Sequence, residues 1–468
     1  VKRLRISAKN DDTTRMDDFK WQPFVLFVAN DFRLETELAP AFENSRQYFS
    51  TRNTGVAMKI FDRHRVDVLV IDESLFQDKT IDRKYRQYIF DLYKKAIERN
   101  PKIMTLILFD KKNSAFVEGF KRRSEVFIKL DRKTINVNRM KYLLQVFARQ
   151  TYRSVVVNDI PINSVASIPL YTQKDAHSEV ELFLKEGESF TKEKREILHQ
   201  IGLNRIFVKS EQLSEMLHTT EMFFSEESHL IRKRYKMFLS YFLDCTHDDK
   251  TYIGKQLSEI GMDIILRLEK LIAKFPTPYD AFCELPFRRF SELSHGLNSA
   301  IYTLILGRHC CIDNLEELAF AALVHDHGKF EINFTPGTHG RFFSSLMENL
   351  DYKKHPEYCL ELIKRKCIKL NRESMNAILC HHENFDATGF PQGIGGRELS
   401  LESSLMSLVD LYDHLKTIHK YNTHVTAEQA WYALLDVHKK SLLGAKFNPE
   451  LIAMIDEFFT QKSMKKSA

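Results

Sequence analysis

The chain has 468 residues, of which 43% are hydrophobic and 28% charged, and its formal net charge is +6. This length is too great for one hydrophobic core and predicts two to four domains, while the composition is that of a folded soluble protein. So small a net charge argues against a nucleic-acid binder, and no apolar stretch is long enough to cross a membrane. The seven cysteines are scattered without a CxxC pair, and the polar start from Val1 to Met16 lacks the apolar core of a secretory signal, so we expect a cytoplasmic protein.

The first 150 residues alternate short apolar runs with amphipathic segments. Strands are expected at Phe24–Asn30, Val66–Asp72, Ile103–Phe109 and Val126–Leu130, and a helix at Arg86–Arg99. Continuous apolar strands that alternate with helices predict a parallel sheet covered on both faces. Ligands of such sheets bind at the carboxyl ends of the strands, where the sequence places Asn30-Asp31, Asp72 and Lys129.

These strand-end residues resemble those of a response-regulator receiver domain, which has a flavodoxin-like α/β fold, over roughly residues 20–150. The resemblance implies that Asp72 is the phospho-acceptor, that Asp31 belongs to an acidic pair that binds Mg²⁺, and that Lys129 binds the phosphate. Asn30 replaces one acid of that pair, and no hydroxyl residue ends the fourth strand. The sequence therefore favours a receiver-like domain that no longer takes phosphate.

A second, smaller α/β domain is expected at residues 155–212. Its strands are predicted at Ser167–Thr172, Glu179–Leu184 and Arg205–Val208, with a helix to Ile201 capped by Thr191. This segment carries no ligand signature, so we interpret it as a spacer or docking domain.

Residues 213–275 are predicted to form a helical linker. Apolar side chains recur there at steps of three and four, at Leu257, Ile260, Ile264, Leu268, Leu271 and Phe275. Such a stripe is usually core. The alternative is a homodimer seam that carries a signal between domains.

The last third of the chain holds seven residues of the types that bind transition metals. They are His295, His325, Asp326, His355, His381, His382 and Asp410, at intervals of about one helix plus a connection. Imidazole and carboxylate without thiolate form a catalytic ligand set for Fe, Mn or Zn, and we expect Fe or Mn before Zn. Seven ligands exceed the needs of one ion, so two divalent ions that share a carboxylate are predicted.

The pair His325-Asp326 follows an apolar helical run, Leu318–Val324. Adjacent His and Asp side chains can face one ion, and the second oxygen of Asp326 can reach another ion. Lys329 lies three residues after Asp326 and would share its face if the helix continued. Its ammonium group would then bind a substrate phosphate or neutralise charge in the transition state. We therefore expect Asp326 and Lys329 to be catalytic.

The motifs His325–Lys329, His381–Glu383 with Asp386, Gly389–Gly393 and Asp410–Asp413 resemble, in this order, those of the HD-GYP family of bacterial signalling phosphodiesterases. The resemblance covers residues 276–468 and implies an all-helical HD-type bundle. It assigns His295, His325, Asp326 and Asp410 to one ion, and Asp326, His355, His381 and His382 to the other. It also implies cyclic di-GMP as substrate, opened to the linear dinucleotide or GMP, and signalling partners such as a diguanylate cyclase domain.

Six positions depart from the family pattern. Ser291 replaces a glutamate that binds a third ion, and Ala387 replaces a loop glycine. Phe390 replaces the tyrosine of GYP, and His414 replaces an alanine. His419 and Asn422 replace two cationic residues that bind the substrate phosphate. The residues expected to contact substrate are Lys329, Gly389, Phe390, Pro391, His419 and Tyr421. The sequence thus predicts a cyclic di-GMP phosphodiesterase. The alternatives are a weakened or inactive metal-containing module that senses nucleotide or binds a protein, and hydrolysis of another phosphate ester.

Overall fold

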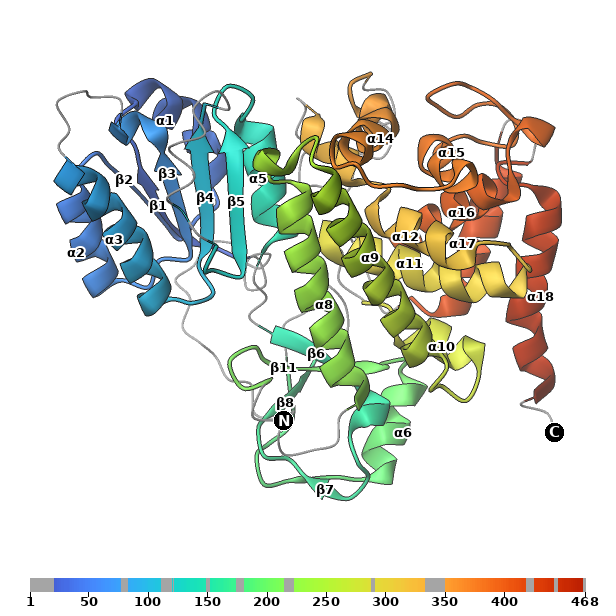
Figure 1. The fold of residues 1–468 in the computed structure, drawn as a ribbon. Coiled ribbons are helices and arrows are strands. Elements are labelled where there is room, and N and C mark those ends of the chain that lie inside the picture. Colours follow the sequence, from blue (N-terminus) through green and yellow to red (C-terminus); the bar gives the residue numbers. More distant parts are fainter. Residues whose placement is uncertain are drawn as a thin grey trace. The chain divides into compact units, whose positions relative to one another are not determined.

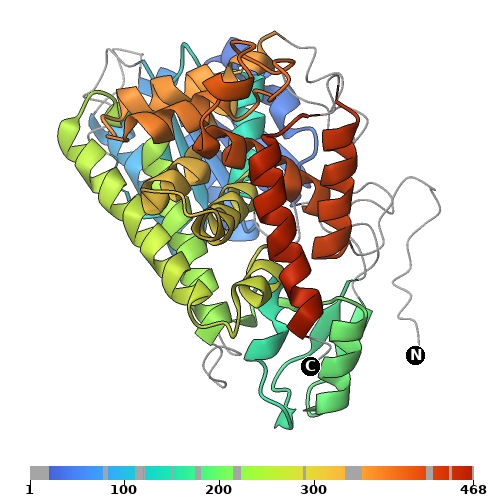
Figure 2. The same cartoon turned by 90° about the vertical axis from the view of Figure 1, so that its right-hand side faces the viewer.

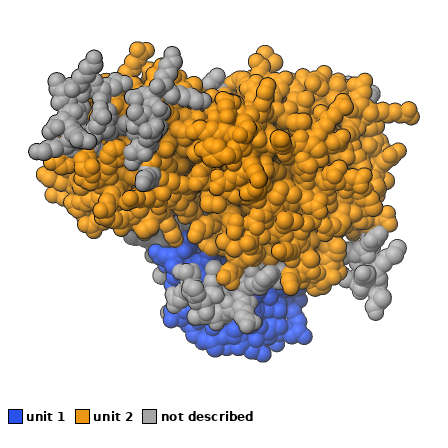
Figure 3. Space-filling view, viewed as in Figure 1, with its two compact units in different colours: residues 1–21, 149–221, 420–424 blue, residues 22–148, 222–419, 425–468 orange. Residues whose placement is uncertain are grey.

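The computed structural model describes residues 21–76, 83–110, 120, 122–148, 152–173, 181–213, 223–287, 291–332, 350–417, 425–441 and 445–465. The chain forms two compact units (Figure 3). One comprises residues 1–21, 149–221 and 420–424, and the other comprises residues 22–148, 222–419 and 425–468.

The larger unit begins with a parallel sheet of five strands in the order β2-β1-β3-β4-β5 (Figure 1). The strands are β1 (Phe24–Val28), β2 (Gln47–Thr51), β3 (Val68–Asp72), β4 (Met104–Phe109) and β5 (Val126–Asp131), and the helices are α1 (Phe32–Leu38), α2 (Thr54–Arg63), α3 (Arg83–Arg99) and α5 (Val137–Val146). The predicted parallel α/β region is confirmed. The edge strand β2 was missed because its sequence, QYFST, is polar and only partly buried.

The smaller unit contains a four-stranded antiparallel sheet in the order β6-β11-β8-β9. Its strands are β6 (Tyr152–Val156), β8 (Leu170–Thr172), β9 (Glu181–Leu184) and β11 (Arg205–Lys209), and β7 (Ser164–Val165) pairs with β10 (Ser189–Phe190). Helix α6 (Lys192–Gln200) begins where the sequence predicts, because the Thr191 side chain accepts a hydrogen bond from the backbone of Lys194. It ends before Gly202, whose φ of 70° only glycine adopts readily.

The other regular elements described in the larger unit are helices, which confirms the predicted helical C-terminal region (Figures 1 and 2). Its helices are α8 (Phe223–Phe242), α9 (Thr251–Ile272), α10 (Pro278–Glu284), α11 (Glu292–His309), α12 (Leu315–Val324), α14 (His355–Arg365), α15 (Arg372–Cys380), α16 (Leu401–Thr417), α17 (Ala427–Lys439) and α18 (Pro449–Lys465). Helix α11 is buried on all sides from Leu293 to Gly307 and packs against α12 and α16. Polar side chains on such a helix are shielded from water, which suits a metal site.

The apolar stripe of α9 belongs to this core. Leu257, Ile264, Leu268 and Leu271 are each at most 3% exposed, and α9 packs against α8, α11 and α12. The stripe is thus used within the chain, and the homodimer seam stays a hypothesis. Among the described residues, no helix combines the length and apolarity that a membrane span requires.

Candidate metal centre

The predicted ligands come from five helices, and most of them lie at or just beyond a helix end. His295 lies in α11 and Asp410 in α16, His325-Asp326 directly follow α12, His355 begins α14, and His381-His382 directly follow α15. His295, His355 and His381 are completely buried, and Asp326 and Asp410 are 4% exposed. Side chains at helix ends can converge from several directions, and this is what assembles the centre.

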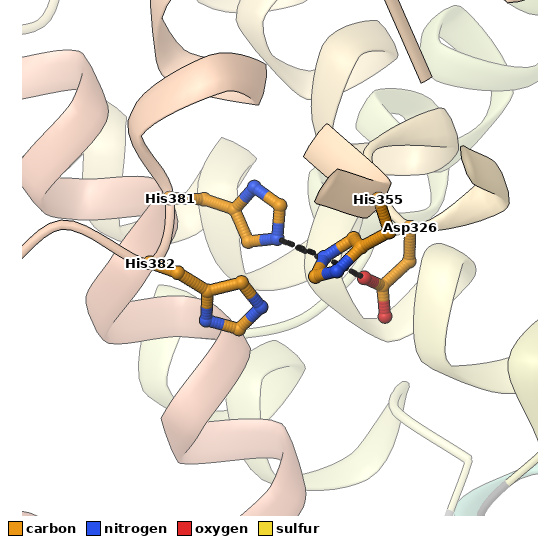
Figure 4. A group of neighbouring side chains, drawn as sticks. All are labelled: Asp326, His355, His381 and His382. Carbon is orange, nitrogen blue, oxygen red and sulfur yellow. Dashed lines mark hydrogen bonds and ion pairs between the residues drawn. The ribbon is translucent and has the colours of Figure 1, made fainter. Parts of the chain in front are cut away.

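Their ligand atoms form two groups that share Asp326. We name Asp326, His355, His381 and His382 the His355 group (Figure 4), and His295, Asp326, Asp410 and His414 the Asp410 group. In each group the candidate ligand atoms lie within 4.8 Å of one another. His325 lies beside both groups, because its Nε2 is 3.6 Å from Asp410 Oδ1 and 3.8 Å from Asp326 Oδ2.

In the His355 group, unprotonated imidazole nitrogens face each other. His355 Nδ1 is 2.7 Å from the Tyr352 carbonyl and His381 Nδ1 is 2.6 Å from the Ile378 carbonyl. A carbonyl only accepts, so both Nδ1 atoms are donors and both Nε2 atoms of the neutral rings carry lone pairs. These Nε2 atoms are 3.1 Å apart (Figure 4), and His355 Nε2 is 3.2 Å from Asp326 Oδ1. Lone pairs held so close favour a cation between them.

In the Asp410 group, a second carboxylate orients the histidine. His295 Nε2 is 3.1 Å from Asp410 Oδ1 and 3.3 Å from Asp326 Oδ2, while its Nδ1 is 2.7 Å from Asp413 Oδ2. Asn298 donates a hydrogen bond of 2.8 Å to the other oxygen of Asp413. Asp413 therefore holds the ring of His295 with Nε2 toward the centre, the role of a carboxylate behind a metal-bound histidine. The sequence reading assigned it no such role.

The pKa values in the centre suit metal binding. Burial lowers the pKa of His355 to about 4, and it also lowers those of His381 and His382. Burial alone would raise the pKa of Asp326, but the charges of Lys329 and neighbouring histidines hold it well below the usual value. Neutral imidazoles and an ionised carboxylate are the forms that bind metal. Within the described residues, His325 Nε2, His382 Nε2 and Asp410 Oδ1 are buried without a hydrogen bond, as expected of atoms that serve an ion.

His295 differs from the other histidines. Burial lowers its pKa, but the carboxylates of Asp326, Asp410 and Asp413 together hold it well above the usual value. These carboxylates favour positive charge at this point, whether from a proton or from a metal cation.

Lys329 lies against the shared carboxylate. Helix α12 ends at Val324, yet the short 3-10 helix η6 (His327–Glu331) keeps the Lys329 ammonium in contact with Asp326 Oδ2, and 3.8 Å from Glu292 Oε2. Burial lowers the pKa of Lys329, but Asp326 and Glu292 raise it more, so it lies well above the usual value. A permanently charged ammonium therefore borders the centre.

The Gly389–Gly393 loop covers the His355 group. The Phe390 ring stacks on His382 with 4.7 Å between ring centroids, and Phe390 is 5% exposed. Glu383 Oε1 accepts hydrogen bonds from the backbone of Gln392 at 2.6 Å and Gly393 at 3.0 Å, which holds the loop in place. Ala387 adopts a φ of 60° at the position where the family has glycine. His419, Tyr421 and Asn422 lie outside the described residues.

The strand-end residues of the N-terminal sheet are arranged differently from the sequence prediction. Asp72 is fully buried at the end of β3, and the cation beside it is Arg132, whose Nε is 3.1 Å from Asp72 Oδ1. The same guanidinium pairs with Asp31, which also caps α1. Lys129 was expected beside the phosphate, but its Nζ lies over the Phe127 ring, 5.7 Å from the centroid. Burial raises the pKa of Asp72 although Arg132 opposes the shift.

His327, between Asp326 and Gly328, connects the metal-site segment with α5 and α8. Its Nδ1 and Nε2 are each 2.6 Å from a tyrosine hydroxyl, of Tyr142 in α5 and Tyr235 in α8. Tyr235 donates its proton to the Leu323 carbonyl, so it must accept from His327 Nε2–H, and Tyr142 must donate to Nδ1. Burial lowers the pKa of His327 to about 3, which keeps the ring neutral. Sequence reasoning gave this histidine no role.

Comparison with known proteins identifies part of this region. Residues 310–445 match the family model described as "HD domain". This segment is an HD domain. It contains six of the seven predicted ligands, because only His295 lies before the matched residues.

Three curated relatives each resemble part of the chain. The "3'3'-cGAMP-specific phosphodiesterase 3" of Vibrio cholerae is 28% identical over 140 residues, 29% of each chain. The "Cyclic di-GMP phosphodiesterase" of Thermotoga maritima is 25% identical over 140 residues, 29% of this chain and 35% of the relative. The "Cyclic di-GMP phosphodiesterase PdeB" of Borreliella burgdorferi is 27% identical over 179 residues, 37% of this chain and 41% of the relative. The chain thus spans less than half the length of each of these relatives.

A solved structure, "Bd1817, a HDG"Y"P protein from Bdellovibrio bacteriovorus", is 16% identical and covers 66% of this chain and 99% of its own. The TM-score is 0.36, which is too low for this likeness to carry an argument.

Proposed function

We propose that the chain is a metal-dependent phosphodiesterase that hydrolyses cyclic di-GMP at a dinuclear centre. The observation that carries the proposal is the sharing of Asp326: its Oδ1 faces His355 and its Oδ2 faces His295. One carboxylate between two groups of buried ligands is what two neighbouring ions need. The names of the relatives supply the substrate class, since they act on cyclic di-GMP or cGAMP.

In this proposal one ion is held by His295, His325, Asp326 and Asp410, and the other by Asp326, His355, His381 and His382. Two divalent ions, Fe or Mn before Zn, would generate a hydroxide nucleophile and stabilise the leaving oxygen. Asp413 and the carbonyls behind the histidines orient the ligands.

Lys329 would bind a non-bridging oxygen of the substrate phosphate. Its ammonium is buried beside the centre and its pKa is raised, so it carries a charge that needs no reorganisation when negative charge develops. The Gly389–Pro391 loop would border the base or ribose of the substrate, with Phe390 offering an apolar ring where the family has a tyrosine.

A second candidate is a metal-containing module that binds a nucleotide or a partner protein without turnover. The apolar side chains beside the His355 group favour it, because Phe390, Tyr352 and Ile332 form one buried apolar cluster there. Such a module would take its signal from the N-terminal domain at residues 20–150 and the linker at 213–275. Mg²⁺ binding at that N-terminal domain is disfavoured, because the Arg132 guanidinium already pairs with both Asp31 and Asp72.

The test is metal analysis of the anaerobically purified chain combined with a cyclic di-GMP turnover assay. Wild-type protein should carry about two ions, and Asp326→Ala should carry none, because this residue serves both groups. Asp436→Ala, an exposed carboxylate of α17, is the matched control. Stoichiometric metal in Asp326→Ala would contradict the shared-ligand assignment. Metal-loaded wild type that binds but does not cleave cyclic di-GMP would establish the second candidate instead, and failure to bind it would exclude this substrate.

A further inference from the structure

His414 stands where the family pattern has alanine, and it points into the centre. It lies one helical turn after Asp410 in α16, so both side chains share a face. Its Nε2 is 3.4 Å from Asp410 Oδ1, and its ring centroid is 4.8 Å from that of His295. The side chain is 11% exposed. An imidazole has therefore replaced a methyl group beside the ligands of the Asp410 group.

We propose that His414 is an additional ligand of the ion held by His295, Asp326 and Asp410, and that it occupies the coordination position which alanine would leave to water or substrate phosphate. This inference rests on the proposed function, since it assumes that the Asp410 group holds an ion.

The surroundings of Asp410 distinguish a ligand from a simple hydrogen-bond partner. Three imidazole nitrogens surround Asp410 Oδ1, at 3.1 Å from His295, 3.4 Å from His414 and 3.6 Å from His325. This oxygen is buried, yet it makes no hydrogen bond within the described residues. Several nitrogens that converge on a buried carboxylate oxygen without hydrogen-bond geometry are typical of donors that face one cation.

The number of ligands gives the proposal its consequence. His295, His325, Asp326, Asp410 and His414 would supply five side chains to one ion. If that ion took six ligands, one of them a hydroxide, no position would be left for substrate. The His355 group has four side chains, so it keeps room for a phosphate oxygen. The ion of the Asp410 group would therefore be tightly held and have no free coordination position, whereas the ion of the His355 group would keep one.

The experiment compares full-length wild type, His414→Ala, His414→Gln and the control His309→Ala. His309 lies on α11 away from the centre and contacts the Met454 carbonyl, so its loss tests for a general effect of removing a histidine. Each protein is loaded with Co²⁺ and mixed with excess chelator. The readouts are the number of ions, the rate at which each is lost, and the binding of inorganic phosphate.

If His414 is a ligand, His414→Ala and His414→Gln should both lose one of the two ions about 10–100-fold faster than wild type and His309→Ala. His414→Ala should also gain binding of inorganic phosphate, because a coordination position opens. Gln can keep a hydrogen bond to Asp410 but offers no imidazole nitrogen. Metal retention restored by Gln would overturn the ligand role in favour of a positioning role. Two ions in wild type with equal loss rates in all variants would overturn this inference alone, whereas wild type without metal would overturn the proposed function as well.

Discussion

Gly328 is the point at which the segment after His325-Asp326 passes closest to α14. A Cβ at this position would lie 1.9 Å from the His355 carbonyl oxygen and 2.5 Å from the Cys359 backbone nitrogen. Both contacts are with backbone, so no rotamer change relieves them, and the two segments must separate by roughly 1 Å in a closely packed interior. Overpacking of this kind costs about 1–3 kcal/mol. Because His355 Nε2 and Asp326 Oδ1 are only 3.2 Å apart, the same shift would pull the His355 group open.

We therefore predict that Gly328→Ala lowers the free energy of unfolding by about 1–3 kcal/mol and reduces bound metal to one ion or none. The assays are denaturant unfolding of the metal-free protein and elemental analysis of the purified protein. Gly55→Ala in α2 is the matched control, since its Cβ would approach only the Asn53 side chain, at 3.1 Å. An unchanged unfolding midpoint together with two bound ions would refute the reasoning that backbone contact at Gly328 sets the geometry of the centre.

Three further predictions follow from the described contacts. Lys329→Ala should lower turnover by roughly 10²–10³-fold without loss of metal, as expected for one transition-state charge contact; an unchanged rate would make Lys329 a structural residue. A small phosphodonor with Mg²⁺ should not modify the buried Asp72, and stable stoichiometric modification abolished by Asp72→Asn would contradict this. Tyr142→Phe should destabilise the protein by about 1–3 kcal/mol, because it leaves His327 Nδ1 buried without a donor. Denaturant unfolding beside the exposed control Tyr88→Phe checks it, and equal stability of the two variants would refute it.

The sequence predicted the elements whose local signals agree with their burial. The strands β1, β3, β4 and β5 are continuous apolar runs and are buried, whereas β2 is a half-exposed edge strand without that pattern. The helix after Thr191 was predictable because its cap and terminal glycine act locally. Local chemistry does not decide the backbone at Ala387: the residue adopts a φ of 60° although αL costs residues with a Cβ about 1–2 kcal/mol.

The side chains at the strand ends of the N-terminal sheet were harder to assign, because their roles depend on packing between distant elements. Lys129 points to Phe127 rather than to Asp72, and Arg132, just beyond the end of β5, pairs with Asp72 instead. Which of the two cations pairs with Asp72 depends on how β5 lies relative to β3 across β4, and no local sequence pattern specifies this. His414 offered a usable signal, since a spacing of four residues from Asp410 in a helix places both on one face.

The N-terminal domain and the centre are joined by contacts that do not need phosphate. Arg139 in α5 pairs with Glu331 at the end of η6, and Tyr142 in α5 donates to His327 in the same segment. His327 directly follows Asp326, so a shift of α5 must either break these buried contacts or move the backbone that carries the shared carboxylate. Breaking these contacts is costly, because Tyr142 and His327 form a hydrogen bond of 2.6 Å between buried groups. The contacts of α5 with η6 therefore link the N-terminal α/β region to the segment that carries Asp326, and the Arg132 pair with Asp72 lies outside this link.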